Sequence, residues 1–114
     1  MIEIKNETEK VILVGVSLSD QDDTKESLEE LKDLVSTAGA ETVGMVIQNR
    51  EQQHPGTYVG KGKIEELKSM IWELRATGIV CDDELSPAQM KNLQDELDVK
   101  VMDRTLIILD IFAA

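Results

Sequence analysis

Hydrophobic residues in this chain follow two alternating patterns. Short, largely β-branched apolar runs occupy residues 11–16, 42–47, 79–81 and 99–102. Runs of this length and composition predict strands that are buried on both faces of a sheet. Between these runs, apolar residues recur every three or four positions, as they do on the inner face of a helix. The pattern therefore predicts four alternations of strand and helix.

Local signals indicate where the first two helices begin and end. Asp23 and Glu26 have the spacing of a capping box. Gly39 suits the left-handed position that commonly follows a helix. The second helix is predicted to begin near Gly62 and to end at Gly78.

Ser86 and Pro87 open the third predicted helix, with Gln89 completing a capping box. Repeated strand–helix alternation favours right-handed crossovers and a parallel sheet. We therefore predict an α/β fold with a small, open, parallel four-stranded sheet, helices on both faces and Rossmann-like layering. A length of 114 residues fits one domain spanning residues 1–114.

The last predicted helix differs from the others because residues 105–114 are apolar at nearly every position. A helix of that composition needs burial on most sides. Composition leaves two interpretations open: a buried final element, or a truncated helix that continues into another domain. If this apolar surface is exposed, we expect self-association of the fragment through it.

Composition limits the classes of function. With 23 acidic and 12 basic residues, the net charge is −11, which argues against a generally basic nucleic-acid-coating protein but not against a local basic site. A single cysteine excludes an internal disulfide framework and fits a cytoplasmic location. No apolar run approaches the roughly 20 residues of a membrane span. Residues 1–8 are expected to form a flexible lead, without the pattern of a signal peptide.

One stretch of this acidic chain is basic. Residues 48–63 carry a net charge of +2 and the remainder −13, with Arg50, Lys61 and Lys63 as the bases. Open amides at a helix start, next to Gly60, Gly62 and these cations, suit a phosphate or another anion. The alternative is a mobile loop with solvated lysines.

The basic stretch does not match a nucleotide-hydrolysing motif. A Walker A loop places four residues between its first glycine and the Gly-Lys pair, followed by Ser or Thr. Here Gly56 and Gly60 are separated by three residues, and Gly62 follows Lys61. The dinucleotide fingerprint is also absent, because no G-x-G-x-x-G directly follows a strand. We predict no catalytic residue in this chain.

The other polar candidates have structural alternatives. Residues 82–84, Asp-Asp-Glu, follow the third predicted strand and could hold magnesium, but acids before a helix more often complement its dipole. His54 is the only histidine, so neither a metal site nor a catalytic triad is expected. Asp103 and Arg104 either pair locally or connect the last helix to the preceding loop.

Three ordered motifs resemble the N-terminal domain of the HflX family of translational GTPases. The first comprises residues 50–55 and 57–67 (TYVGKGKIEEL), the second residues 82–93 (DDELSPAQMKNL), and the third residues 101–113 (VMDRTLIILDIFA). The similarity covers roughly residues 9–114. It implies that residues 105–114 begin a helix leading to a helical segment and a G domain, which would bind GTP and Mg²⁺. No cofactor is expected in this domain.

The resemblance also implies partners and residue roles. The family binds the large ribosomal subunit and helps to split or rescue ribosomes. We therefore expect an rRNA- or anion-binding set whose lysines and arginine contact phosphates, whose glycines allow close backbone approach, and whose tyrosine stacks on a base or packs the loop. This set is Arg50, Tyr58, Gly60, Lys61, Gly62 and Lys63. A structural set, expected to orient the outgoing helix, is Ser86, Pro87, Asp103 and Arg104.

Two other functions are compatible with the sequence. The domain could dock on its own G domain and tune the GTPase rate. Alternatively, the glycine-lysine loop could form a weak ATP- or phosphate-binding module.

Overall fold

The computed structural model describes residues 8–113. Four strands alternate with four helices, as predicted, and each predicted strand overlaps an observed one. Their order is β1 (Lys10–Ser17), α1 (Thr24–Thr37), β2 (Glu41–Asn49), α2 (Lys61–Leu74), β3 (Gly78–Cys81), α3 (Pro87–Leu97), β4 (Lys100–Asp103) and α4 (Arg104–Ala113). Most of the predicted flexible lead, residues 1–7, lies outside the described residues.

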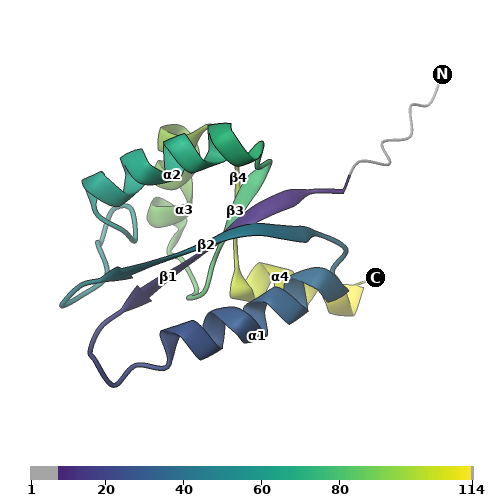
Figure 1. The fold of residues 1–114 in the computed structure, drawn as a ribbon, viewed down its shortest axis with the longest axis horizontal. Helices are drawn as coiled ribbons and strands as arrows, with labels where there is room; N and C mark the ends of the chain where they lie inside the picture. Colours follow the sequence, from purple (N-terminus) through teal and green to yellow (C-terminus); the bar gives the residue numbers. More distant parts are fainter. Residues whose placement is uncertain (1–7, 114) are drawn as a thin grey trace.

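The strands form one parallel sheet in the order β2-β1-β3-β4. Helices α1 and α4 cover one face, and α2 and α3 cover the other (Figure 1). The predicted α/β fold class is therefore confirmed. Because β1 and β3 are neighbours at the centre, their carboxyl ends form the switch point of the sheet, where ligands commonly bind in open α/β folds.

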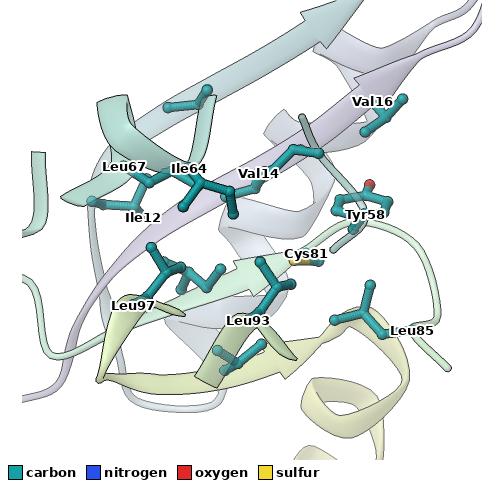
Figure 2. Packing of buried hydrophobic residues seen from close by; sticks show 14 of the residues in the cluster. Ile12, Val14, Val16, Tyr58, Ile64, Leu67, Cys81, Leu85, Leu93 and Leu97 are labelled. Carbon is teal, nitrogen blue, oxygen red and sulfur yellow. The ribbon is translucent and has the colours of Figure 1, made fainter. Parts of the chain in front are cut away.

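Strand β1 contributes to both hydrophobic cores, because successive side chains of a strand point to opposite faces. Val11 and Leu13 pack with residues of α1 and α4. Ile12, Val14 and Val16 pack on the other face, against α2 and α3 (Figure 2). Burial on both faces explains why this strand is apolar at almost every position.

Two predicted helix ends are wrong in detail. Asp23 is the N-cap of α1, but its side chain makes no cap hydrogen bond, because φ −89° and ψ 38° depart from the extended conformation of a capping residue. Helix α2 ends at Leu74 and is followed by a left-handed Arg75. Gly78 instead begins β3, where a Cβ would lie 2.7 Å from the Lys100 carbonyl oxygen. Gly39, with φ 97°, does follow α1 in the predicted left-handed conformation.

The capping box of α3 is confirmed. Ser86 Oγ accepts the Gln89 N–H at 3.1 Å, and Gln89 Oε1 accepts the Ser86 N–H at 3.0 Å. Pro87 occupies the first position of the helix. Gln89 has a second role, because its Nε2 donates to the His54 carbonyl oxygen at 2.9 Å. The start of α3 therefore also holds the loop that precedes α2.

Helix α4 is covered along one side. Ile107 is its buried residue and belongs to the core shared with α1. Leu106, Leu109 and Phe112 are 43%, 58% and 83% exposed. A fully buried final element is therefore the wrong interpretation, and an apolar surface remains on α4.

The long loop between β2 and α2 is a folded part of the domain. His54 and Tyr58 exchange two backbone hydrogen bonds of 3.1 and 2.9 Å. His54 Nδ1 accepts the N–H groups of Gly56 and Thr57 at 3.0 and 3.1 Å. Asn92 of α3 donates to the Gly56 carbonyl oxygen at 2.9 Å. These bonds hold the loop in one conformation over α3.

Tyr58 inserts this loop into the core. Its side chain is fully buried at the end of the cluster that includes Val16 and Cys81 (Figure 2). Its hydroxyl donates to Asp83 Oδ2 at 2.6 Å. The backbone of Tyr58 has φ 67°, a left-handed conformation that costs about 1–2 kcal/mol. Burial, reinforced by Asp83, raises the pKa of the phenol.

We expect Gly15→Ala to lower the free energy of unfolding by about 1–3 kcal/mol, the usual cost of overpacking. A Cβ at Gly15 would lie 2.9 Å from Thr24 Cγ2 and 3.3 Å from Leu28 Cδ1. The matched control is Gly62→Ala, where no atom lies within 4 Å of the added Cβ. Urea denaturation of both variants measures the difference, and equal stabilities would contradict tight packing of α1 on β1.

Because the phenol of Tyr58 is buried, we expect the free energy of unfolding of this chain to fall above pH 10. The ordinary pKa of the phenol is 10.0, and burial raises it in the folded chain. Above pH 10 the unfolded chain releases this proton and the folded chain keeps it, so stability falls by about 1.4 kcal/mol per pH unit.

Tyr58→Phe should remove this contribution, at a cost of about 1.5–3 kcal/mol at neutral pH for the lost bond to a carboxylate. Urea unfolding of both proteins between pH 7 and pH 11 measures the difference. Other groups, including the buried Cys81 thiol, titrate in both proteins and cancel. Parallel pH profiles would refute the assignment.

Candidate functional site

Most of the predicted anion-binding residues gather at the first turn of α2. The helix has Gly60 as its N-cap, and the Gly60 N–H donates to Gln48 Oε1 at 2.8 Å. A Cβ at Gly60 would lie only 2.7 Å from Arg50 Nη1. Glycine therefore allows the guanidinium to pack against the backbone. Lys61 directly follows Gly60 in the chain, and we call Arg50, Gly60, Lys61 and Gly62 the α2 corner.

The α2 corner presents backbone amides to solvent. The bond from the Ile64 N–H to the Gly60 carbonyl oxygen, 3.0 Å long, is the first of the helix. The three preceding N–H groups, those of residues 61–63, have no carbonyl four positions back within the helix. The first turn contains no acidic residue, and both Lys61 and Gly62 are exposed. Such a turn attracts anions through its amides and the helix dipole.

Lys63 does not join Lys61 on one surface. Residues two positions apart on a helix are rotated by about 200°, so the two side chains leave α2 in nearly opposite directions. The Lys63 side chain is 21% exposed, and its Nζ lies 2.7 Å from Glu66 Oε2. The predicted phosphate contact of Lys63 would therefore lie on a different face of α2 from that of Lys61.

Tyr58 cannot stack on a base in this structure, because its side chain is fully buried. It packs the loop, the other role expected for it. The two exposed aromatic residues are Trp72 and Phe112, at 84% and 83%. Trp72 was not among the predicted site residues, although helical spacing from Ile64 and Leu67 places it away from their inner face.

The crevice at the carboxyl ends of β1 and β3 is small and acidic. It encloses about 260 Å³ and is lined by Asp22, Asp23, Asp82 and Asp83, among others. Four carboxylates disfavour a phosphate or nucleotide at the position where open α/β sheets usually bind one. Within residues 8–113, no three His, Cys, Asp or Glu side chains are grouped so as to hold a metal ion.

Arg104 connects α4 to α1 and to the end of β3. Its Nε and Nη2 donate to Asp82 Oδ1 at 3.1 and 2.8 Å, and its Nη1 donates to Glu30 Oε1 at 2.6 Å. Nη2 also donates to the Ser27 carbonyl oxygen at 2.9 Å. Partial burial acts to lower the pKa of Arg104, but the bonds to the two carboxylates outweigh it and the pKa is raised. Arg104 is therefore a charged link between three elements.

Asp103 holds the other side of the same junction. This buried carboxylate accepts the Leu85 N–H through Oδ2 and the Leu106 N–H through Oδ1, both at 2.9 Å. It therefore caps α4 and fixes the loop before α3. Of the two alternatives for Asp103 and Arg104, the connection to the rest of the domain is the one observed.

In the described part of the chain, no helix has the length and apolar character needed to cross a bilayer.

Comparison with known proteins is consistent with this architecture. The family model described as GTP-binding GTPase N-terminal matches residues 25–113. GTPase HflX of Lacrimispora saccharolytica is 68% identical over 114 residues, which cover 100% of this chain and 27% of that protein. GTPase HflX of Escherichia coli is 39% identical over 105 residues, covering 92% and 24%. The chain thus spans about a quarter of the length of these curated relatives.

Solved structures share the fold. A structure of SsGBP with GDP has a TM-score of 0.68 at 24% identity and covers 91% of this chain and 29% of that one. A GTP-binding protein from Sulfolobus solfataricus, in complex with GDP, has a TM-score of 0.67 at 24% identity over 91% of this chain and 30% of that one. The family model, the identities and the shared fold together show that this chain belongs to the HflX GTPase family and corresponds to its N-terminal domain.

Proposed function

We propose that this domain is the RNA-facing module of an HflX-type GTPase and contacts the large ribosomal subunit through the α2 corner. The observation that carries the proposal is the pairing of Arg50 and Lys61 with open amides on a chain of net charge −11. Neither Arg50 nor Lys61 takes part in any of the ion pairs between the described residues.

Electrostatics supports contact through one corner rather than through the whole surface. Ribosomal RNA is a dense polyanion and repels an acidic protein except where bases face it. Several other bases are engaged by carboxylates of this chain: Lys63, Lys68, Lys91, Lys100 and Arg104. Gly62 adds no side chain to the corner, so phosphate oxygens can approach its amide closely.

The wider activity is proposed for the protein that carries this domain. The curated relatives are named GTPases and are about four times as long as this chain. We expect a G domain to bind GTP with Mg²⁺, and the whole protein to split or rescue ribosomes in the cytoplasm. The bonds of Asp103 and Arg104 and the helix start at Ser86 and Pro87 would fix the direction in which α4 leaves the domain.

Replacing Arg50 and Lys61 by alanine should weaken binding of the full-length protein to the large subunit. Each lost phosphate contact should reduce the magnitude of the slope of the log association constant against log salt concentration by about 1. The slope of the double variant should therefore be smaller by about 2 than that of the unaltered protein. The matched control is Lys25→Ala with Lys32→Ala, which removes the same charge from exposed positions of α1. Equal salt slopes for the two double variants would refute the α2 corner as the contact.

A second candidate function is supported by the exposed apolar surface of α4, formed by Leu106, Leu109 and Phe112. This surface could dock on the G domain and restrain its turnover, while Arg104 holds α4 in place. It is also the surface through which the fragment could self-associate.

The docking hypothesis is tested by GTPase rates measured without ribosomes. Removal of residues 1–114 from the full-length protein should raise the rate, and Arg104→Ala should raise it less, because that variant frees α4 without removing it. Lys100→Ala, which breaks an exposed ion pair with Glu9, serves as the control. Identical rates for all four proteins would exclude regulation through this surface.

A further inference from the structure

We propose that Trp72 stacks on an unpaired RNA base, and that the outer ridge of α2 binds single-stranded RNA. We define the outer ridge as Lys61, Lys68, Trp72 and, just after the helix, Arg75. The inference rests on the proposed function and deepens it, because it names the form of RNA and the residue that reads an exposed base.

Helix geometry aligns the members of the outer ridge. At about 100° per residue, Lys68 and Trp72 lie within about 20° of Lys61 on either side. The buried residues Ile64 and Leu67 point toward the sheet, and α2 lies on the outside of the domain (Figure 1). Lys61 and Trp72 are therefore exposed, whereas Lys68 between them is half-buried and pairs with Glu96 of α3.

Packing keeps Trp72 at the surface. Leu74 Cδ1 and Met70 Cε each lie 3.2 Å from the position of a Cβ on Gly44, so they fill the contact between α2 and β2. Trp72 is left 84% exposed, beside a hollow of about 730 Å³ that it lines with Ile71 and Ala76. An open indole face next to a hollow suits stacking, which is available with any base because every base has a π-face.

The charges of the ridge favour a polyanion as its occupant. Lys61 and Arg75 take part in none of the ion pairs found between described residues. Lys68 Nζ lies 3.4 Å from Glu65 Oε1 and 3.6 Å from Glu96 Oε2. Exposed ion pairs of this kind contribute only about 0–1 kcal/mol to stability, so a phosphate can replace the carboxylates. Glu65, Glu73 and Glu96 adjoin the middle and the far end of the ridge, so the ridge favours a polyanion through Lys61 and Arg75 at its two ends.

The length of the ridge points to a single strand. Lys61 and Trp72 are 11 positions apart, about 16 Å along the helix axis, which exceeds the reach of one nucleotide. A duplex hides the faces of its bases, whereas a loop or an end can splay them onto an aromatic side chain. We therefore assign the ridge to several nucleotides of an unpaired segment, with Trp72 against one base.

The first experiment uses fluorescence, because Trp72 is the only tryptophan of this chain. The 114-residue chain is titrated with a mixed-sequence oligoribonucleotide of about 12 nucleotides, within the range bound by single-strand modules. Saturable quenching by the single strand, and weaker quenching by the same sequence in a duplex, is expected. Equal quenching by both forms, or none, overturns the stacking assignment.

The second experiment measures binding of the full-length protein to the large ribosomal subunit. Trp72→Ala should raise the Kd about 5- to 100-fold, the range expected for one stacked base. Trp72→Phe keeps an aromatic face and should recover most of the affinity. Leu18→Ala is the control, because Leu18 is also an exposed apolar residue, at 46%, but follows β1, and it should leave the Kd unchanged.

The outcomes separate this inference from the proposed function. If the unaltered protein binds the subunit and Trp72→Ala binds equally well, the ridge assignment fails and the α2 corner stands. If the unaltered protein does not bind the subunit, the proposed function fails, and the inference built on it fails as well. If Trp72→Ala weakens subunit binding but RNA does not quench the indole, the ridge contacts a protein, and the RNA assignment is overturned.

Discussion

Burial of Tyr58 is the contact on which the candidate site depends. The ring occupies the end of the core between the sheet and α3, and its hydroxyl is bound to Asp83. This contact draws a polar, glycine-containing loop onto the domain and brings Arg50 against Gly60 at the start of α2. The favourable burial of an aromatic side chain offsets the left-handed backbone at Tyr58. Tyr58 thereby fixes the loop that carries Arg50, together with the hydrogen bonds of His54, Gln89 and Asn92.

Charge divides the carboxyl edge of the sheet into two regions, because both the acidic crevice and the start of α2 lie there. Carboxylates line the crevice at the switch point of the sheet, whereas bases and open amides lie at the α2 corner. Arg104 neutralises Asp82 within the domain and connects α4 to α1. Charge therefore has a structural role at the crevice and, in our proposal, a recognition role at the α2 corner on the same edge of the sheet.

The family motifs combine structural and surface residues. Tyr58, His54 and Gln89 hold the loop through burial and hydrogen bonds, and Asp103 caps α4. The same motifs also contain exposed positions, which include Lys61 and Gly62. A motif by itself does not separate these roles, because a residue that fixes a loop and one that contacts a partner can be adjacent in sequence.

The sequence alone was sufficient to predict the element order, the parallel α/β fold and the start of α3, because these depend on local periodicity and on capping between near neighbours. It also located the basic stretch. Only the tertiary structure decided that Tyr58 is buried and that Arg104 reaches Glu30 of α1. These outcomes depend on how segments far apart in the chain pack together. Side-chain direction and burial are properties of that packing, which local patterns do not determine.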